Sequence, residues 1–163
     1  MFRHLAACVT LVAALVAPAS AAEFIVDRNH PRASDANPGT SDAPLQTISA
    51  GVAKMAPGDV VTVRAGVYPE LVRIGAGGED GRVCVLRASP GEKVVIAGPD
   101  DARVGITWSG SGYLRITGLT VKGTYGNGRH IGISGESGHH IEVSRCVVVG
   151  TRIFLTNHTD SVV

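Results

Sequence analysis

The chain has 163 residues, with 15 Lys and Arg, 14 Asp and Glu, and a formal net charge of +1. This near balance gives no electrostatic reason to expect a nucleic-acid partner. The 21 Gly and an aromatic content of only 4% favour many turns and short strands over a helical bundle, and the length fits one domain.

Residues 1–21 have the three parts of a secretory signal peptide. A basic start at Arg3 is followed by an apolar run from Leu5 to Val16 and then by the small residues 19–21. The apolar run is shorter than the roughly 20 residues of a membrane-spanning helix. We therefore expect cleavage after Ala21 and a secreted or periplasmic protein, from a bacterial source, with no membrane association after cleavage.

Residues 22–58 predict an N-terminal turn followed by a capping helix. A turn-forming run at 35–40 precedes a segment in which Ile48, Val52 and Met55 share one helical face. Thr47 is a suitable N-cap, and a Pro-Gly pair ends the helix. So short a helix needs an apolar surface to cover, and the open end of a stack of strands provides one.

Oxygen-bearing side chains gather near this turn and raise the question of a metal site. They are Asp27, Asn29, Asp35, Asn37 and Asp42. Their spacing does not match an EF-hand calcium loop, and Asp or Asn before Pro-Gly commonly bonds the local backbone. We therefore interpret them as turn residues and predict no metal site.

Residues 59–150 predict the coils of a solenoid. The β-rich run at Val60 recurs about 23 residues later at Val83, and residues 72–74 match residues 94–96. A second pair of runs, 113–121 and 140–148, is offset by about 27 residues and matches apolar residues at alternating positions. Repeats of this length built from short strands are typical of solenoids, so we predict an all-β fold of about three to four coils.

The repeats also assign the two cysteines that remain after cleavage. The first repeat places Cys84 at the position of Val61, and the second places Cys146 at an apolar position. Although a secreted protein can form disulfides, this placement predicts two buried free thiols.

The order of motifs at the start of the chain resembles that of a known family. The motifs are Asp35-Ala36-Asn37-Pro38-Gly39-Thr40, Pro44-Leu45-Gln46-Thr47-Ile48, Pro57-Gly58-Asp59 and Arg64-Ala65-Gly66-Val67-Tyr68-Pro69-Glu70. They look like the N-terminal region of secreted proteins of the pectate lyase superfamily, closest in layout to family nine polysaccharide lyases and less close to family six. The resemblance covers about Phe24 to Gly150 and implies a right-handed parallel β-helix with an N-terminal capping helix.

For activity, the resemblance implies β-elimination from a uronic acid of an acidic polysaccharide. In such lyases Ca²⁺ neutralises the uronate carboxylate, and a Lys or Arg removes the C5 proton. No acidic run after Asp101 matches the family's motifs, so the catalytic residues are unknown and we expect the chain as given to be inactive. The alternative is a non-enzymatic secreted carbohydrate-binding or surface β-helix, because one scaffold serves many functions.

Two basic residues are the candidates for contact with an anionic sugar. Lys122 and Arg129 lie near the loop between the repeated coils, where a solvated loop charge is the simpler interpretation of each.

Histidines and aromatic residues are further candidates for a functional role. His130, His139 and His140 suggest metal or acid–base chemistry, but adjacent His139 and His140 would point to opposite faces of a strand and would not share an ion. We therefore predict loop or strand-start histidines. Trp108 and Tyr113 are interpreted as core or corner aromatics rather than as a sugar platform.

Residues 151–163 contain neither an amphipathic helix nor a Gly-punctuated coil. We therefore expect an irregular or truncated end there. A β-helix that lacks a second cap exposes a parallel edge that is prone to pair with another chain.

Overall fold

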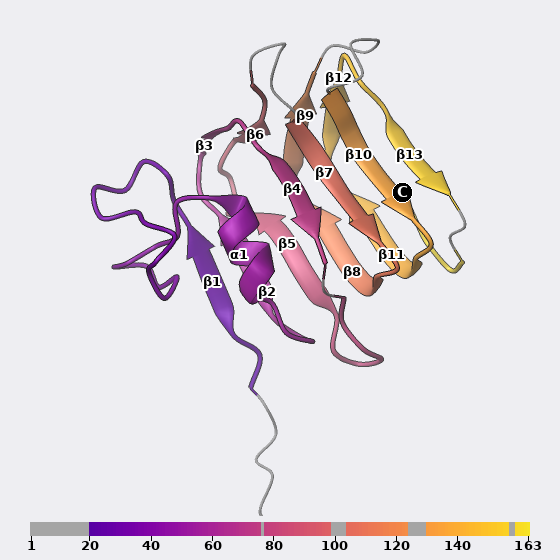
Figure 1. Ribbon diagram of the computed structural model, residues 1–163, viewed down its shortest axis with the longest axis horizontal. Helices are drawn as coiled ribbons and strands as arrows, with labels where there is room; N and C mark the ends of the chain where they lie inside the picture. The colour runs from indigo at the N-terminus through magenta and orange to yellow at the C-terminus, as the bar shows by residue number, and fades with distance from the viewer. Residues whose placement is uncertain (1–19, 76, 99–103, 124–129, 157–158) are drawn as a thin grey trace, which may run out of the picture.

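A computed structural model describes residues 20–75, 77–98, 104–123, 130–156 and 159–163 (Figure 1). Nearly all of the predicted signal peptide, Arg129 and the side chain of His130 lie outside the described part. One helix, α1 (Ile48–Lys54), is present among these residues, together with short strands in three sheets. In the described residues no helix has the length and apolar character needed to cross a membrane.

The chain passes through the three sheets in turn, and each pass makes one coil. The first sheet is formed by β1 (Glu23–Val26), β2 (Val60–Val63), β5 (Cys84–Ala88), β8 (Gly112–Thr117) and β11 (His139–Ser144). The second is formed by β3 (Gly66–Tyr68), β6 (Val94–Ile96), β9 (Leu119–Lys122) and β12 (Val147–Val149). The third is formed by β4 (Leu71–Ile74), β7 (Val104–Ser109), β10 (His130–Glu136) and β13 (Ile153–Thr156).

All pairings between these strands are parallel, and each strand pairs with its counterpart one coil away. Figure 1 shows the strands stacked side by side from β1 at one end to β13 at the other. The predicted all-β parallel β-helix with a capping helix is therefore confirmed. β1 already belongs to the stack, since it pairs with β2 along its whole length.

The offset of about 27 residues is confirmed as a structural register. Leu114 pairs with Ile141, and Ile106 pairs with Ile133. The earlier offset of about 23 residues is wrong, because Val61 pairs with Leu86 rather than with Cys84. The slip is an even number of residues, so the same side chains still point inward.

The match of residues 72–74 with residues 94–96 is also wrong. Strand β4 pairs with β7 in the third sheet, whereas β6 pairs with β3 in the second. Both segments are short and rich in Val and Ile, so their sequences alone do not tell the two sheets apart.

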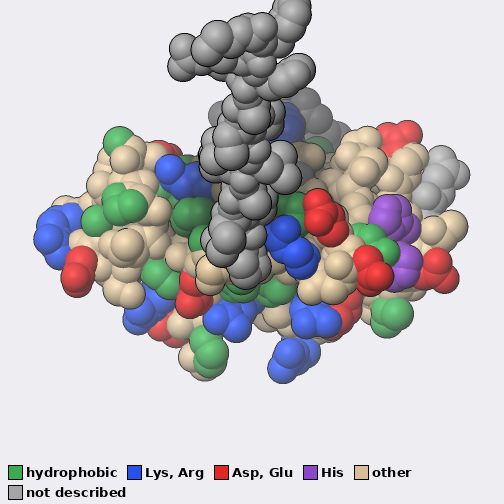
Figure 2. All heavy atoms as spheres, turned by 90° about the horizontal axis from the view of Figure 1, so that it is seen from below, with side chains coloured by type: hydrophobic (Ala, Val, Ile, Leu, Met, Phe, Trp, Pro, Cys, Tyr) green, Lys and Arg blue, Asp and Glu red, His purple; other side chains and the backbone are tan. Residues whose placement is uncertain are grey.

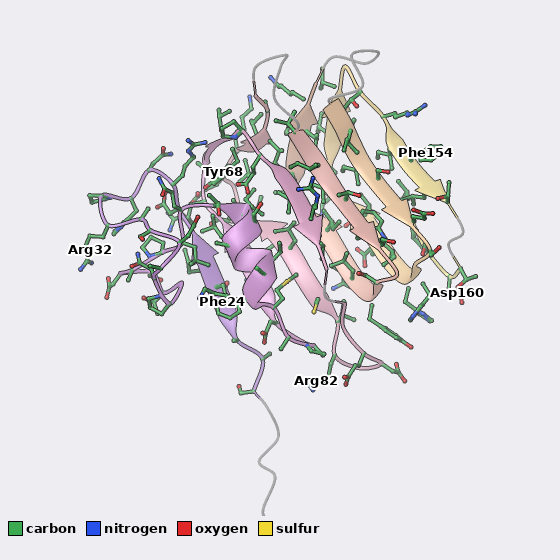
Figure 3. The ribbon with its side chains drawn as sticks, in the orientation of Figure 1. Phe24, Arg32, Tyr68, Arg82, Phe154 and Asp160 are labelled. Atoms are coloured by element: carbon green, nitrogen blue, oxygen red, sulfur yellow. The ribbon has the colours of Figure 1, made fainter. Side chains whose placement is uncertain are left out.

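The interior is a set of apolar ladders that run along the stack. In the first sheet Val61, Leu86, Ile116 and Val143 are stacked in register, and each is at most 3% exposed. Tyr68 begins a second ladder and is buried at the position labelled in Figure 3. Burying one such side chain stabilises the fold by about 1.5–3 kcal/mol, so the ladders are the main source of stability.

Helix α1 covers the first coil, as predicted. The Thr47 side chain accepts a hydrogen bond from the Ala50 N–H, which is N-cap geometry. Ile48 and Val52 are buried, and α1 contacts β1, β2 and β4. Gly51 permits this close approach, because a Cβ there would lie 2.9 Å from a Val61 methyl group.

Two carboxylates from outside the helix hold its first turn. Glu70 accepts hydrogen bonds from the N–H groups of Ile48 and Ser49, both at 2.9 Å, and from the Ser49 hydroxyl. Asp35 accepts from the N–H of Thr47 at 2.8 Å and from its hydroxyl at 2.9 Å. A negative charge at this end also interacts favourably with the helix dipole.

Residues 151–163, expected to be irregular, continue the stack. β13 pairs with β10 in register, from Ile153 opposite Ile133 onward. Beyond it, isolated parallel bridges join Thr159 to His139 and Val162 to Glu142, in the position of a further strand of the first sheet. The expectation of an irregular segment is wrong because a strand can form there without the Gly punctuation that marks the earlier turns.

Replacing Glu70 with Ala is expected to destabilise the protein by about 1–2 kcal/mol, because two N–H groups of the α1 first turn lose their acceptor. Urea denaturation followed by circular dichroism measures this change. Glu79→Ala is the control, since Glu79 makes only a 3.9 Å ion pair with Arg82 at the surface, and should change stability by less than about 0.5 kcal/mol. Equal losses in the two variants would contradict the capping role of Glu70.

Candidate functional site

The outer face of the first sheet carries the largest organised set of polar side chains in the described residues. Strand alternation turns Thr62, Arg87, Thr117 and Ser144 outward, and the register stacks them in one line across four coils. A neighbouring line places Arg115 opposite Glu142. Seen from below, basic and acidic side chains are interspersed over the surface (Figure 2).

Ion pairs link different coils on this face: the pair of Arg87 with Glu23 spans two strand spacings, and that of Arg115 with Glu142 spans one. Arg87 lies 3.1 Å from Glu23 and donates to the Thr62 hydroxyl at 3.0 Å, and Arg115 lies 2.6 Å from Glu142. The side chains in the two ion pairs are 39–49% exposed, so the guanidinium groups are accessible to solvent.

These contacts change the acidity of the two glutamates. A hydrogen bond from Arg115, and then one from the Ser144 hydroxyl, hold the pKa of Glu142 below its ordinary value. The Thr62 hydroxyl, and then Arg87, do the same for the pKa of Glu23. Both carboxylates are therefore negative at neutral pH, and the adjacent arginines keep a fixed counter-charge.

A groove of about 420 Å³ runs along the edge of this face. Arg87, Arg115 and Arg145 line it from three successive coils, together with Thr117 and the 89–92 loop. Arginine is the side chain best suited to hold a carboxylate, because its planar group offers two parallel N–H donors. The groove therefore has the chemistry of a site for carboxylate-bearing ligands.

The two basic residues predicted from the sequence do not lie in this groove. Lys122 is exposed at the end of β9, where it lines a separate hollow of about 440 Å³ on the second sheet with Lys93. Arg129 lies outside the described residues. A role for either residue in substrate binding stays a prediction.

None of the three groove arginines was predicted from the sequence. Each one stands beside an inward apolar residue or at the end of its strand, where a charge is ordinarily a solvated surface charge. A signal was present in the recurrence of Arg next to the core position of successive coils. Recognising it required the register of β5 against β8, which neither sequence repeat covers.

The prediction that His139 and His140 point apart is wrong. His140 adopts a φ of 52°, which breaks strand alternation and brings its Nδ1 to 3.1 Å from Nδ1 of His139. Tyr113, from the coil before, stacks on the His140 ring at 4.6 Å with an angle of 11° between the planes. In Figure 2 histidine side chains lie together toward the end of the molecule away from β1.

The remaining candidate residues of the sequence have structural roles. Trp108 is 2% exposed and packs in the core as predicted, whereas Tyr113 is half-buried at a coil corner. Cys84 and Cys146 are free, and burial raises the pKa of each thiol. Asn37 donates to the backbone oxygens of Arg32 and Pro44, as expected of a turn residue.

A calcium site would need several carboxylates with free oxygens, and three of those near the cap are already engaged. Asp35, Asp59 and Glu70 each accept hydrogen bonds from two backbone N–H groups. No group of three or more His, Cys, Asp or Glu with metal-binding geometry occurs among the described residues.

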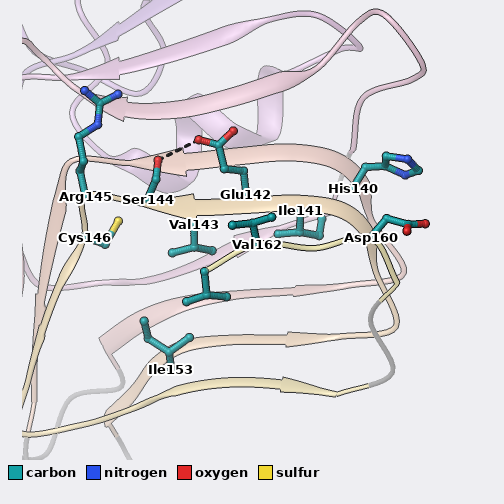
Figure 4. A pocket seen from close by; sticks show the side chains of 11 residues that line it. His140, Ile141, Glu142, Val143, Ser144, Arg145, Cys146, Ile153, Asp160 and Val162 are labelled. Carbon is teal, nitrogen blue, oxygen red and sulfur yellow. Dashed lines mark hydrogen bonds between the residues drawn. The ribbon is translucent and has the colours of Figure 1, made fainter.

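A larger hollow, of about 730 Å³, lies at the last coil (Figure 4). Its floor is formed by the ends of the interior ladders, Ile141, Val143 and Cys146, and Val162 and Ile153 lie beside them. The Ser144 hydroxyl donates to Glu142 at its rim. This hollow lies at the end of the described coils, and charged residues such as Glu142, Arg145 and Asp160 line it beside the apolar floor.

The fold is shared with known proteins. A GH136 lacto-N-biosidase from Eubacterium ramulus matches in its native form with a TM-score of 0.58 and 18% identity, over 78% of this chain and 27% of that chain. Its selenomethionine derivative matches with a TM-score of 0.57 and 19% identity, over 77% and 26%. A rhamnogalacturonan lyase matches with a TM-score of 0.47 and 17% identity, over 85% and 56%.

No family model matches the chain, and no curated protein is significantly similar to it in sequence. At 18% identity the likeness to the lacto-N-biosidase establishes the parallel β-helix fold, which this chain has in common with a carbohydrate-active enzyme. The chain spans about a quarter of the length of that enzyme, since it covers 27% of it.

Replacing Arg115 with Gln is expected to raise the pKa of Glu142 toward its ordinary value, because the largest cause of the lowering is removed. The folded-state pKa is depressed, so this pair stabilises the protein above the unfolded pKa of about 4.3, and the contribution is lost as the pH falls through the folded pKa. A carbon-13 NMR titration of the Glu carboxyl groups measures the shift. Arg64→Gln, which removes the partner of Glu92, should leave Glu142 unchanged.

Proposed function

We propose that this chain is part of a secreted β-helix protein that acts on acidic polysaccharide, and that the groove on the first sheet binds the glycan through its carboxylates. The observation that supports this most is the convergence of Arg87, Arg115 and Arg145 in one groove, from three coils. The carbohydrate-active enzyme with the same fold adds support for a glycan as the ligand class.

The spacing of the coils suits a polymer with repeated negative charges. Parallel strands lie about 4.8 Å apart, so the β-helix presents its outward groups at regular steps along the stack. Arg87 is in register with polar Thr117, and residues 89–91 of the neighbouring loop are small, which leaves room for an extended chain. A linear uronate polymer has matching features, namely regularly spaced carboxylates and many hydroxyl groups.

The internal ion pairs leave donors available to a ligand. Arg115 contacts Glu142 through Nε, and a guanidinium group has five N–H donors in all. Arg145 lies close enough to Glu142 to lower its pKa, and its side chain is exposed. A uronate carboxylate can therefore bind beside the existing glutamates without displacing them.

Uronate β-elimination, in the manner of the family nine lyases, is the more specific version of this proposal. It requires Ca²⁺ bound by acidic side chains, and the carboxylates near the cap are occupied with backbone N–H groups. The described residues therefore support glycan binding more strongly than elimination, and we derive no catalytic step from them.

Glycan binding is tested with the chain from Ala22 to Val163 by affinity electrophoresis in gels that contain polygalacturonate, alginate or neutral dextran. We expect retardation by the two acidic polymers alone, and less of it as salt screens the charges. An Arg115→Gln/Arg145→Gln double variant should bind about tenfold more weakly, which corresponds to about 1.4 kcal/mol.

Two further variants serve as controls for this assay. Arg32→Gln removes an exposed charge of the N-terminal loop and should bind as the parent does, and Lys122→Gln tests the residue predicted from the sequence. Equal retardation in dextran, or unchanged binding of the double variant, would rule out the groove as the acidic-glycan site.

Elimination is tested separately, by following the absorbance of unsaturated uronate on polygalacturonate and alginate with and without Ca²⁺. We expect binding without product formation. Product formed by the parent chain but not by the groove double variant would favour the lyase over the binding scaffold.

A further inference from the structure

The buried carboxylate of Asp59 meets the backbone of Ala22 immediately before β1. Asp59 is only 6% exposed, and its Oδ1 accepts a hydrogen bond from the Ala22 N–H at 2.8 Å. Its Oδ2 accepts from the Ala56 N–H, also at 2.8 Å. The Ala22 carbonyl accepts from the Val60 N–H at 2.9 Å, so both ends of this residue are bound to the start of β2.

A buried carboxylate is costly unless it is hydrogen-bonded or paired with a positive charge. None of the ion pairs among the described residues includes Asp59. The nearby Arg82, labelled in Figure 3, donates instead to the Pro57 carbonyl at 2.6 Å and pairs with Glu79. The Asp59 carboxylate therefore accepts hydrogen bonds from neutral donors, and a cation in place of one donor would stabilise its buried negative charge more strongly.

We propose that an endopeptidase specific for small residues cleaves the chain between Ala21 and Ala22, and that the new N-terminal ammonium group of Ala22 forms an ion pair with Asp59. Water adds across the peptide bond, so Ala21 gains a carboxylate and the Ala22 nitrogen gains protons to become an ammonium group. This inference rests on the export that the proposed function assumes, but it concerns a different part of the chain from the glycan groove.

Two independent observations meet at this bond. The sequence has the small residues that a leader peptidase requires at positions 19–21, and the structure places a buried acceptor 2.8 Å from the nitrogen that cleavage would release. Ala21 and Ala22 are both exposed, so the bond between them is accessible to a peptidase. Cleavage would thus replace the neutral Ala22 N–H with an ammonium group that has three N–H donors. The resulting ion pair would join the start of β1 to the turn that follows the capping helix.

The ion pair has a definite pH dependence. Asp59 is expected to raise the pKa of the ammonium group above its unfolded value of about 7.7–8.0. A raised folded pKa means that the stabilisation is fully present below the unfolded pKa and is lost as the pH rises through the folded pKa. Arg82, Glu79, Asp80, Glu23 and the Cys84 thiol are titratable or charged groups near this corner, and they are common to every version compared.

The first experiment exports the full chain through the periplasm of a bacterial host and measures the intact mass. The expected mature chain begins at Ala22. The second compares three purified chains that start at Ala22 with a free amine, at an acetylated Ala22, or after a Gly-Ser extension. At pH 6 the free-amine chain should unfold a few degrees above the other two, and the difference should vanish at high pH.

Asp59→Asn should remove the difference between free and acetylated chains, whereas Asp42→Asn, at an exposed turn, should retain it. If Asp59→Asn does not fold, NMR titration of the labelled Ala22 amine in the parent chain still decides, because a pKa at or below about 8 contradicts the ion pair. A mature chain that begins elsewhere, or equal stability of free and acetylated chains, overturns the proposal. None of these measurements uses a glycan, so they succeed or fail independently of the groove.

Discussion

The parallel register between coils is the constraint on which the rest of this structure depends. Each strand hydrogen-bonds to its counterpart one coil away, so the position of every side chain is fixed relative to the next coil. Inside, the register stacks Leu86 on Val61 and Ile116 on Leu86. Outside, it brings Glu142 of one coil to Arg115 of the coil before. The same geometry thus produces the core and the polar face.

The ends of the stack show what this constraint requires. At the first coil α1 covers the apolar ladders, and carboxylates from other segments satisfy its exposed N–H groups. At the last coil the ladders end in the hollow around Ile141 and Val143. A solenoid buries its first and last layers only with a cap or a further layer. The cap therefore needs its own helix and turn residues, and these stand out in the sequence.

The fold could be predicted because its signals are local and repeated. Local backbone geometry produces the apolar alternation around Leu114 and Ile141 and the N-cap at Thr47. These patterns do not depend on which residues pair between the coils. The error in the first offset was harmless for the core, since an even slip from Cys84 to Leu86 keeps the inward face. The groove was not predicted, because Arg87 and Arg115 come together only through the pairing of β5 with β8, which neither sequence repeat covers.

Other features could not be predicted because they depend on departures from regular geometry. The left-handed backbone of His140 turns its ring toward His139, which no strand rule anticipates. Residues 151–163 contain no Gly to mark a further coil, so the pairing of β13 with β10 was not visible in the sequence. The sequence and the fold say less about function. Fold similarity at 18% identity does not transfer an activity from one protein to another.

We propose that the arginines of the first sheet bind the carboxylates of an acidic glycan. A nitrogen-15 NMR titration of the arginine Nε–H signals with an oligogalacturonate tests this at the level of single residues. We expect shifts of the Arg87, Arg115 and Arg145 signals that saturate together, with Arg32 and Arg73 unaffected. Shifts confined to arginines outside the groove, or none at concentrations where the glycan binds, would contradict it.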